Sequence, residues 1–229
     1  MDWSHFGQDT GRKFHANGDV REFPGNTVIS LLEPDSAVYR EICDWQERMR
    51  ASAAEPAVTL LPASSLHMTA IEGVCDQVRD SAHWTRLLPT DAPLEQVHAF
   101  FAEQFQRIDP LPPVHMRFDQ LEIHGGVTMH LFPVNSSDAE ALRLWRDQAS
   151  EALGVRFPNH DVYQYHISLA YGRPQPSAQA KEALLRLKQE SADRYQSAPF
   201  SFSLPQPQLV FFHNMLAFLP LRPRQTIQN

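Results

Sequence analysis

Two short strings of this sequence carry the same kinds of residue in the same order. Each has an apolar residue, a histidine, an apolar residue and a hydroxyl residue, with a glycine six places after the histidine: LHMTAIEG and YHISLAYG. The first contains His67 and Thr69, and the second contains His166 and Ser168. The histidines are 99 positions apart, so each pair can belong to its own half of a folded domain.

Both strings have the length and the apolar, β-branched composition of a strand, and both end at glycine. Side chains two positions apart on a strand share a face and are separated by about 6 to 7 Å. Two such strands would gather two imidazoles and two hydroxyls around one centre. The intervening side chains would face the core: Met68, Ala70, Ile167 and Leu169.

That arrangement suits a phosphate group. The hydroxyls would donate hydrogen bonds to the non-bridging oxygens. One neutral histidine would take a proton from the attacking water, and the other, protonated, would give one to the leaving oxygen. This chemistry requires no metal.

A third match to the pattern, His83 to Thr85, stands in a different context. With eleven histidines in the chain, roughly one such triplet is expected by chance. Charged residues and loop formers surround this one, and no strand alternation is visible. We interpret it as the chance match.

The elements that must position these residues follow from hydrophobic spacing. Strands are predicted at 26–32, at the first motif, at 114–124, at 127–134, at the second motif, at 200–204 and at 208–221. Helices are predicted over 38–49, 94–105, 137–153 and 177–195. Gly125 and Gly126 indicate a tight hairpin turn, and Ser137 with Glu140 indicates a capping box.

The order of these elements repeats. Strand, helix, motif strand, helix and strand are followed by the same five elements, which indicates a duplication. We predict an α+β fold of two similar lobes, each a small antiparallel sheet with flanking helices, around a central cleft. The whole chain, 1–229, would be a single bilobal domain. Lobe 1 spans about 24–124, lobe 2 spans about 127–222, and 1–23 form an N-terminal extension.

Composition limits the partners. A formal net charge of −7 argues against binding a DNA duplex or any long nucleic-acid footprint, which requires a basic face. A small phosphorylated nucleotide or an RNA end remains compatible. The N-terminus lacks the apolar region of a signal peptide, and no stretch approaches the length of a membrane span, so we expect a cytoplasmic protein without membrane contact.

Other candidate groups have plainer interpretations. Five histidines lack any recognised metal-ligand spacing: His115, His124, His130, His160 and His213. Five aromatic residues could stack on a base but are typical of core: Tyr39, Phe132, Tyr163, Tyr165 and Tyr171. Three cations could neutralise a phosphate but are typical of solvated surface: Lys13, Arg40 and Arg173. We expect neither metal nor cofactor.

The paired motifs in a duplicated α+β chain resemble the 2H phosphoesterase superfamily, which includes RNA 2′,3′-cyclic phosphodiesterases and RNA-ligase-like proteins. The opening GRKFHANGDVREFPGNTVIS further resembles a poorly characterised branch of it. The resemblance implies a metal-independent phosphoesterase in which His67 and His166 act as acid and base, while Thr69 and Ser168 hold the phosphate. Many members have Thr in the second motif, and Ser168 retains the hydroxyl.

Three functions are compatible with these observations. The first is an enzyme that opens a cyclic phosphodiester, on a 2′,3′-cyclic nucleotide or an RNA end. The second is a non-catalytic module that binds a phosphorylated nucleotide or RNA terminus in the same cleft, and the third is a structural protein with relic motifs. The sequence leaves open which histidine is the base, which bond is cleaved and the oligomeric state.

Overall fold

The computed structural model describes residues 2–220. Its strands are β1 Gly25–Leu31, β2 Val58–Leu60, β3 His67–Ile71, β4 His115–Ile123, β5 Gly126–Pro133, β6 His166–Gly172, β7 Ser201–Ser203, β8 Gln208–Asn214 and β9 Ala217–Pro220. Its α-helices are α1 Ala37–Arg50, α2 Leu94–Phe105, α3 Ser136–Leu153 and α4 Ala178–Ser197. The strands form one antiparallel sheet in the order β7-β4-β5-β6-β3-β1-β8-β9, and β2 pairs with β6.

The helices begin where side chains satisfy free backbone N–H groups. Ser36 accepts a hydrogen bond from the Tyr39 N–H at the start of α1, and Ser177 does the same for Ala180 at α4. The start of α3 differs from the predicted Ser137 capping box, because Asn135 is the N-cap and accepts from the Asp138 N–H. An asparagine in extended backbone is as good an N-cap as serine, so the helix starts earlier.

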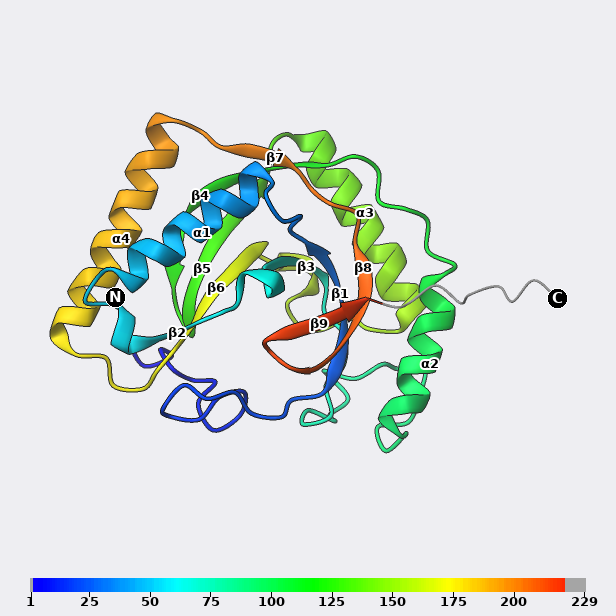
Figure 1. Ribbon diagram of the computed structural model, residues 1–229. Helices are drawn as coiled ribbons and strands as arrows, with labels where there is room; N and C mark the ends of the chain where they lie inside the picture. The colour runs from blue at the N-terminus through cyan, green and yellow to red at the C-terminus, as the bar shows by residue number, and fades with distance from the viewer. Residues whose placement is uncertain (1, 221–229) are drawn as a thin grey trace.

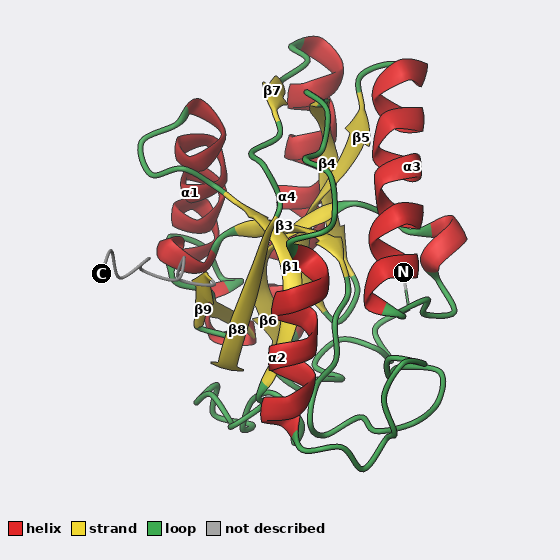
Figure 2. Cartoon of the chain, turned by 90° about the vertical axis from the view of Figure 1, so that its right-hand side faces the viewer, coloured by secondary structure: helices red, strands yellow, loops and turns green. Residues whose placement is uncertain are grey.

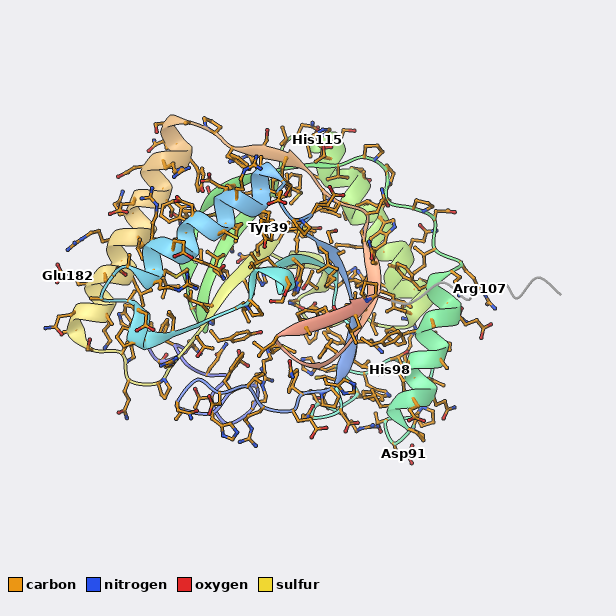
Figure 3. All side chains as sticks on the ribbon, viewed as in Figure 1. Tyr39, Asp91, His98, Arg107, His115 and Glu182 are labelled. Atoms are coloured by element: carbon orange, nitrogen blue, oxygen red, sulfur yellow. The ribbon has the colours of Figure 1, made fainter. Side chains whose placement is uncertain are left out.

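Two pairs of helices flank the sheet. α1 and α4 contact each other and pack on β6 and β4, whereas α2 and α3 contact each other and pack on β8, β3 and β5. Figure 1 shows the two pairs on opposite sides of the strands, and Figure 2 shows the strands between α1 and α3. Charged side chains such as Glu182 on α4 and Arg107 beyond α2 project from opposite edges of the molecule (Figure 3).

The predicted hairpin at Gly125 and Gly126 joins β4 to β5. Neither glycine has a positive φ, and close packing against backbone requires glycine at Gly126. A Cβ atom on Gly126 would overlap the Ala170 carbonyl oxygen, and one on Gly125 would lie 2.8 Å from the Gln8 Nε2. Gly126 therefore lets β6 approach the hairpin backbone.

The predicted repeat of five elements is present. β1, α1, β3, α2 and β4 are followed by β5, α3, β6, α4 and β8, with β2, β7 and β9 as additions. The sheet order is symmetric about the boundary between β6 and β3, where β5 corresponds to β1 and β4 to β8. The last strand of each repeat pairs with the other repeat, since β4 pairs with β5 and β8 pairs with β1.

The α+β class is confirmed, but the two small sheets expected are joined into one. The expected ranges of 24–124 and 127–222 cut across the strand pairing, and residues 221 and 222 lie outside the described part of the chain. The join has a physical reason: pairing β3 with β6 satisfies backbone groups that each separate sheet would leave on an open edge.

The N-terminal segment, expected as an extension, folds back onto the sheet. Phe14 and Phe23 join Leu61, Phe212 and Met215 in an apolar cluster that is separate from the main core. Tyr171 of β6 and Phe218 of β9 pack against this cluster. Among residues 2–220, no helix combines the length and apolar character needed to cross a bilayer.

Candidate active site

The two motifs lie side by side in the sheet. The middle residues of the motifs, Met68 of β3 and Ile167 of β6, are register partners in antiparallel strands. In this register each histidine lies beside the hydroxyl residue of the other motif. The resulting four-residue square consists of His67, Ser168, His166 and Thr69. The imidazoles occupy one diagonal, on which cross-strand neighbours are about 7–8 Å apart, and the hydroxyls occupy the other.

Burial agrees with this geometry. All four members of the square are half-buried, whereas the intervening motif side chains are fully buried, as predicted: Met68, Ala70, Ile167 and Leu169. The structure thus brings the four predicted site residues together on one face of the sheet, which we call the site face. β5 adds Thr128 and His130 to this face, as register partners of Ser168 and His166.

Each motif histidine is oriented by the same local contact. The Nδ1 of His67 lies 2.6 Å from the Ser65 carbonyl oxygen, and the Nδ1 of His166 lies 2.9 Å from the Gln164 carbonyl oxygen. A carbonyl only accepts hydrogen bonds, so each Nδ1 carries the proton. The Nε2 of each neutral ring is therefore the atom free to exchange protons.

The two histidines have lowered proton affinity. Burial lowers the pKa of His67 from its usual 6.5 to about 4, with a further decrease from the charge of His166, although the Ser65 carbonyl opposes it. Burial also lowers the pKa of His166, assisted by the charges of His130 and Lys13. Both rings are predominantly neutral at pH 7 when the site is empty.

Lys13 is the cation that acts on His166. Its ammonium group lies 5.1 Å from the centre of the Tyr171 ring and 3.4 Å from the Asp9 carboxylate. Burial lowers the pKa of Lys13, but the charges of Tyr171 and Asp9 outweigh it and the net pKa is raised. Sequence reasoning placed Lys13 on the solvated surface, because its position depends on the fold-back of the N-terminal segment.

Aromatic side chains surround the square. The Phe218 ring of β9 lies 4.5 Å from the His67 ring in an edge contact, and the Tyr163 ring lies 6.3 Å from the His166 ring. Burial raises the pKa of Tyr163 and the charge of Glu72 adds to the increase, whereas Arg146 and the Thr69 side chain oppose it. Tyr163 was noted in the sequence as an aromatic residue, but its position beside His166 has no sequence signal.

Equivalent helices each donate side-chain hydrogen bonds to a motif strand. From α1, the Gln46 Nε2 donates to the carbonyls of Leu61 (2.8 Å) and Leu169 (2.9 Å). From α3, the Arg146 Nη1 donates to the carbonyl of Ala70. Leu169 and Ala70 are each three positions after a motif histidine. Both repeats therefore have a helix side chain that hydrogen-bonds to the motif strand at the equivalent carbonyl, a contact that we call the brace.

The glycines that end the motifs are also equivalent. A Cβ atom on Gly73 would overlap the Asn26 backbone, and one on Gly172 would lie 2.8 Å from the Gly125 carbonyl oxygen. Asn26 and Gly125 are themselves 99 positions apart, the same offset as the histidines. Each motif therefore ends in glycine because the backbone at the start of its own repeat, at Asn26 of β1 and at Gly125 just before β5, passes too close for a side chain.

The remaining candidates lie elsewhere. His83 contacts Asp80 at 2.9 Å and Thr85 donates to the Leu153 carbonyl, so the third triplet has structural contacts instead. Arg40 donates to the Asp35 carbonyl, and Arg173 donates to the Thr59 hydroxyl at 3.2 Å.

One metal-like cluster occurs within the described residues. Asp147, His160 and Asp161 bring potential ligand atoms within 4.8 Å of one another. Both carboxylates already pair with arginines, because Arg143 and Arg156 contact Asp147 and Arg156 contacts Asp161. Of the five histidines noted in the sequence, His160 alone belongs to this cluster.

Two cavities open beside the square, at the end where Tyr163 and Tyr165 precede β6. One, of about 210 Å³, is largely apolar and is lined by residues that include His130, Phe132 and both tyrosines. The other, of about 100 Å³, lies between α3 and the same tyrosines. Neither cavity is lined by a member of the square, so the predicted central cleft stays a prediction.

A family model matches residues 13–127. It is named 2H-phosphodiest and described as a domain of unknown function (DUF1868). The match covers half of the chain and includes the first motif, and the second motif stands beside it through the register above. The chain belongs to the 2H phosphoesterase superfamily. Membership points to phosphodiesterase activity.

Solved structures similar to this 2H phosphoesterase include a conserved protein of unknown function, ATU0111 from Agrobacterium tumefaciens. It is 27% identical, has a TM-score of 0.84, and the match covers 93% of this chain and 91% of that chain. TT0787 of Thermus thermophilus is 15% identical with a TM-score of 0.47, covering 88% and 100%. E. coli LigT complexed with NADP+ is 13% identical with a TM-score of 0.47, covering 88% and 96%. No curated protein matches the sequence.

Proposed function

We propose that this 2H phosphoesterase hydrolyses a cyclic phosphodiester, on a 2′,3′-cyclic nucleotide or an RNA end, without a metal. The observation that carries the proposal is the register of Met68 with Ile167, which sets two imidazoles and two hydroxyls around one point. Placing proton-transfer groups on opposite sides of a phosphorus atom is what an in-line displacement needs, because one oxygen enters as another leaves.

In this proposal His67 is the general base and His166 the general acid. His67 has the strongly lowered pKa of about 4 and so stays neutral, which lets its Nε2 take a proton from the attacking water. The His166 Nε2 gives its proton to the 2′- or 3′-oxygen that leaves. An anionic phosphate raises the proton affinity of a nearby imidazole, which favours the charged form of His166 once substrate is bound.

The hydroxyls hold the phosphate. Thr69 and Ser168 lie on the other diagonal and would donate to the two non-bridging oxygens, where charge builds up in the transition state. Lys13 supplies a positive charge near His166 that offsets the charge of the phosphodiester.

The test is turnover of 2′,3′-cyclic nucleotides and of oligonucleotides with a cyclic-phosphate end, in EDTA. We expect His67→Ala and His166→Ala each to lower kcat by about 10²- to 10⁴-fold while circular dichroism stays unchanged. His83→Ala is the matched control, since it alters a similar triplet outside the site and should retain full activity.

Full activity in the double histidine variant, or complete loss with chelator, would refute the proposal. Saturable binding of these nucleotides without any product would favour the non-catalytic binding module instead. Retained binding and activity in both single variants would favour relic motifs in a structural protein.

A further inference from the structure

The smaller of the two cavities, about 100 Å³, has room for a small polyatomic anion, since a single water needs only about 10–15 Å³ of such space. Arg143, Arg146 and Asp147 of α3 line it, together with His160, Asp161 and the two tyrosines before β6.

Arg146 is the charge in this lining that has no counter-ion. The residue is 2% exposed, and within residues 2–220 no carboxylate lies in ion-pair distance of its guanidinium. Asp147 forms an ion pair with Arg143 at 2.8 Å, and Arg156 forms ion pairs with both Asp147 and Asp161. Arg143 also pairs with Glu140 at 2.8 Å, so within residues 2–220 Arg146 is the one charged residue of the lining without an ion pair, although its charge acts on the half-buried Glu72.

The Arg146 guanidinium also has an unused donor. Its Nη1 donates to the Ala70 carbonyl, and its carbon lies 4.2 Å from the centre of the Tyr163 ring. Its Nη2 is buried and has no hydrogen-bond partner. A buried, charged donor without a partner is costly, and a phosphate oxygen is among the strongest acceptors for it.

Comparison of the two repeats shows that the charge is not needed for the brace. The equivalent residue in the first repeat, Gln46, holds the Leu169 carbonyl with a neutral amide. A glutamine at position 146 would retain a donor for the Ala70 carbonyl. The charge and the second guanidinium nitrogen of Arg146 therefore need a separate explanation.

We propose that the cavity at Arg146 is a second anion site that binds one phosphate group through the Arg146 Nη2. Tyr163 lies between the cavity and the square, because it lines the cavity and its ring lies 6.3 Å from the His166 ring. The phosphate is either a second phosphate of the substrate or free phosphate. Only the first of these sources rests on the proposed function.

Binding is tested apart from turnover, in a His67→Ala/His166→Ala background. Titration with inorganic phosphate, followed calorimetrically, should show saturable binding that weakens by about tenfold or more in added Arg146→Gln, since a charge-assisted hydrogen bond contributes about 1.5–3 kcal/mol. Arg186→Gln on α4 is the matched control, because it removes an equal charge from a 67% exposed side chain on another helix and should leave binding unchanged.

Absence of saturable phosphate binding in the parent would overturn the proposal, whatever the variants do. Equal affinity in Arg146→Gln and the parent would overturn it as well. If Arg146→Gln fails to fold, Arg146→Lys replaces it, since it keeps the charge but loses the planar fork. Binding weakened in that variant supports the site, and unchanged binding overturns it.

Kinetic measurements on the active enzyme distinguish the two possible sources of the phosphate. A substrate phosphate predicts that Arg146→Gln raises KM by about tenfold for a 2′,3′-cyclic nucleotide carrying a 5′-phosphate but leaves KM for the 5′-hydroxyl form unchanged. Free phosphate predicts unchanged KM for both, with phosphate binding still lost. A lack of turnover in the wild type counts against the proposed hydrolysis alone, because the titration uses an inactive background.

Discussion

His67 and His166 are oriented by the same kind of contact, but their surroundings differ. Each ring is fixed by a carbonyl two residues before it, so the same nitrogen faces the reaction centre in both. Phe218 packs against His67, whereas His130 and Lys13 act on His166. A duplicated site has in this way acquired two unlike halves, which an acid and a base require.

The lowered pKa values predict the pH profile. In the free enzyme, the base works above the His67 pKa of about 4, and the acid works below the His166 pKa, which lies under 6.5. The profile of kcat/KM should therefore be a bell with its optimum between these limits. The profile of kcat should peak at higher pH, because bound phosphate raises the pKa of His166.

Steady-state kinetics from pH 3.5 to 8.5 provide the measurement. A kcat/KM optimum above pH 7 would contradict the assignment of roles. Coinciding kcat and kcat/KM optima would contradict the effect of bound phosphate on His166.

Lys13→Met should change both charge and binding. Removing the cation raises the pKa of His166, so the alkaline limb of kcat/KM moves to higher pH, and KM increases because the phosphodiester loses a counter-charge. Arg12→Met is the matched control, since it removes an equal charge one position away from a side chain that is 49% exposed. NMR titration of the His166 ring follows the pKa directly, and an equal shift in both variants would contradict a specific role for Lys13.

At the scale of elements, the helix donors keep the motif strands in place. Gln46 is buried and holds two carbonyls on neighbouring segments, one beyond β2 and one in β6. Gln46→Leu should lower the free energy of unfolding by about 2 kcal/mol, because it leaves a buried carbonyl without a donor. Urea unfolding measures the change.

Gln189→Leu on the outer face of α4 is the comparison for this variant. Its amide bonds to Asp193 at the surface, so its effect should stay within about 0.5 kcal/mol. Equal effects of the two substitutions would show that the buried bridge contributes nothing.

The elements themselves were largely predictable. Apolar residues at helical spacing located α1 and α2, and the predicted helix end at 153 agrees with α3, which Gly154 terminates with a φ of 69°. The four residues of the square were also predictable, since strand alternation fixes which side chains share a face. Lys13, Tyr163 and the two braces were not, because their positions depend on contacts between segments far apart in the chain.

At the scale of the whole molecule, the repeats are interlocked. β4 belongs to the first repeat, yet its partners, β5 and β7, both lie in the second half of the chain. Helices also pack across the two repeats. α1 of the first repeat packs on β6 of the second, and α3 of the second packs on β3 of the first. Sequence periodicity revealed the repeat but not this exchange, because periodicity carries no information about pairing partners.

Interlocking predicts that neither half folds alone. Fragments 1–124 and 125–229, expressed separately, should lack dispersed NMR spectra, because β4 would have no partner strand and β8 would retain only β9. Mixing the fragments should restore dispersion in both. A dispersed spectrum from the first fragment alone would contradict the exchange as a requirement for folding.

The exchanged strands also limit what a half-length ancestor of this chain could have been. If a single repeat gave its last strand to another copy, as the two repeats do here, such an ancestor would have been a strand-swapped homodimer with its reaction centre on the two-fold axis. Its two histidines would have been chemically identical by symmetry. Gene fusion would then have done more than join two subunits: it allowed one histidine to acquire Lys13 as a neighbour while the other acquired Phe218.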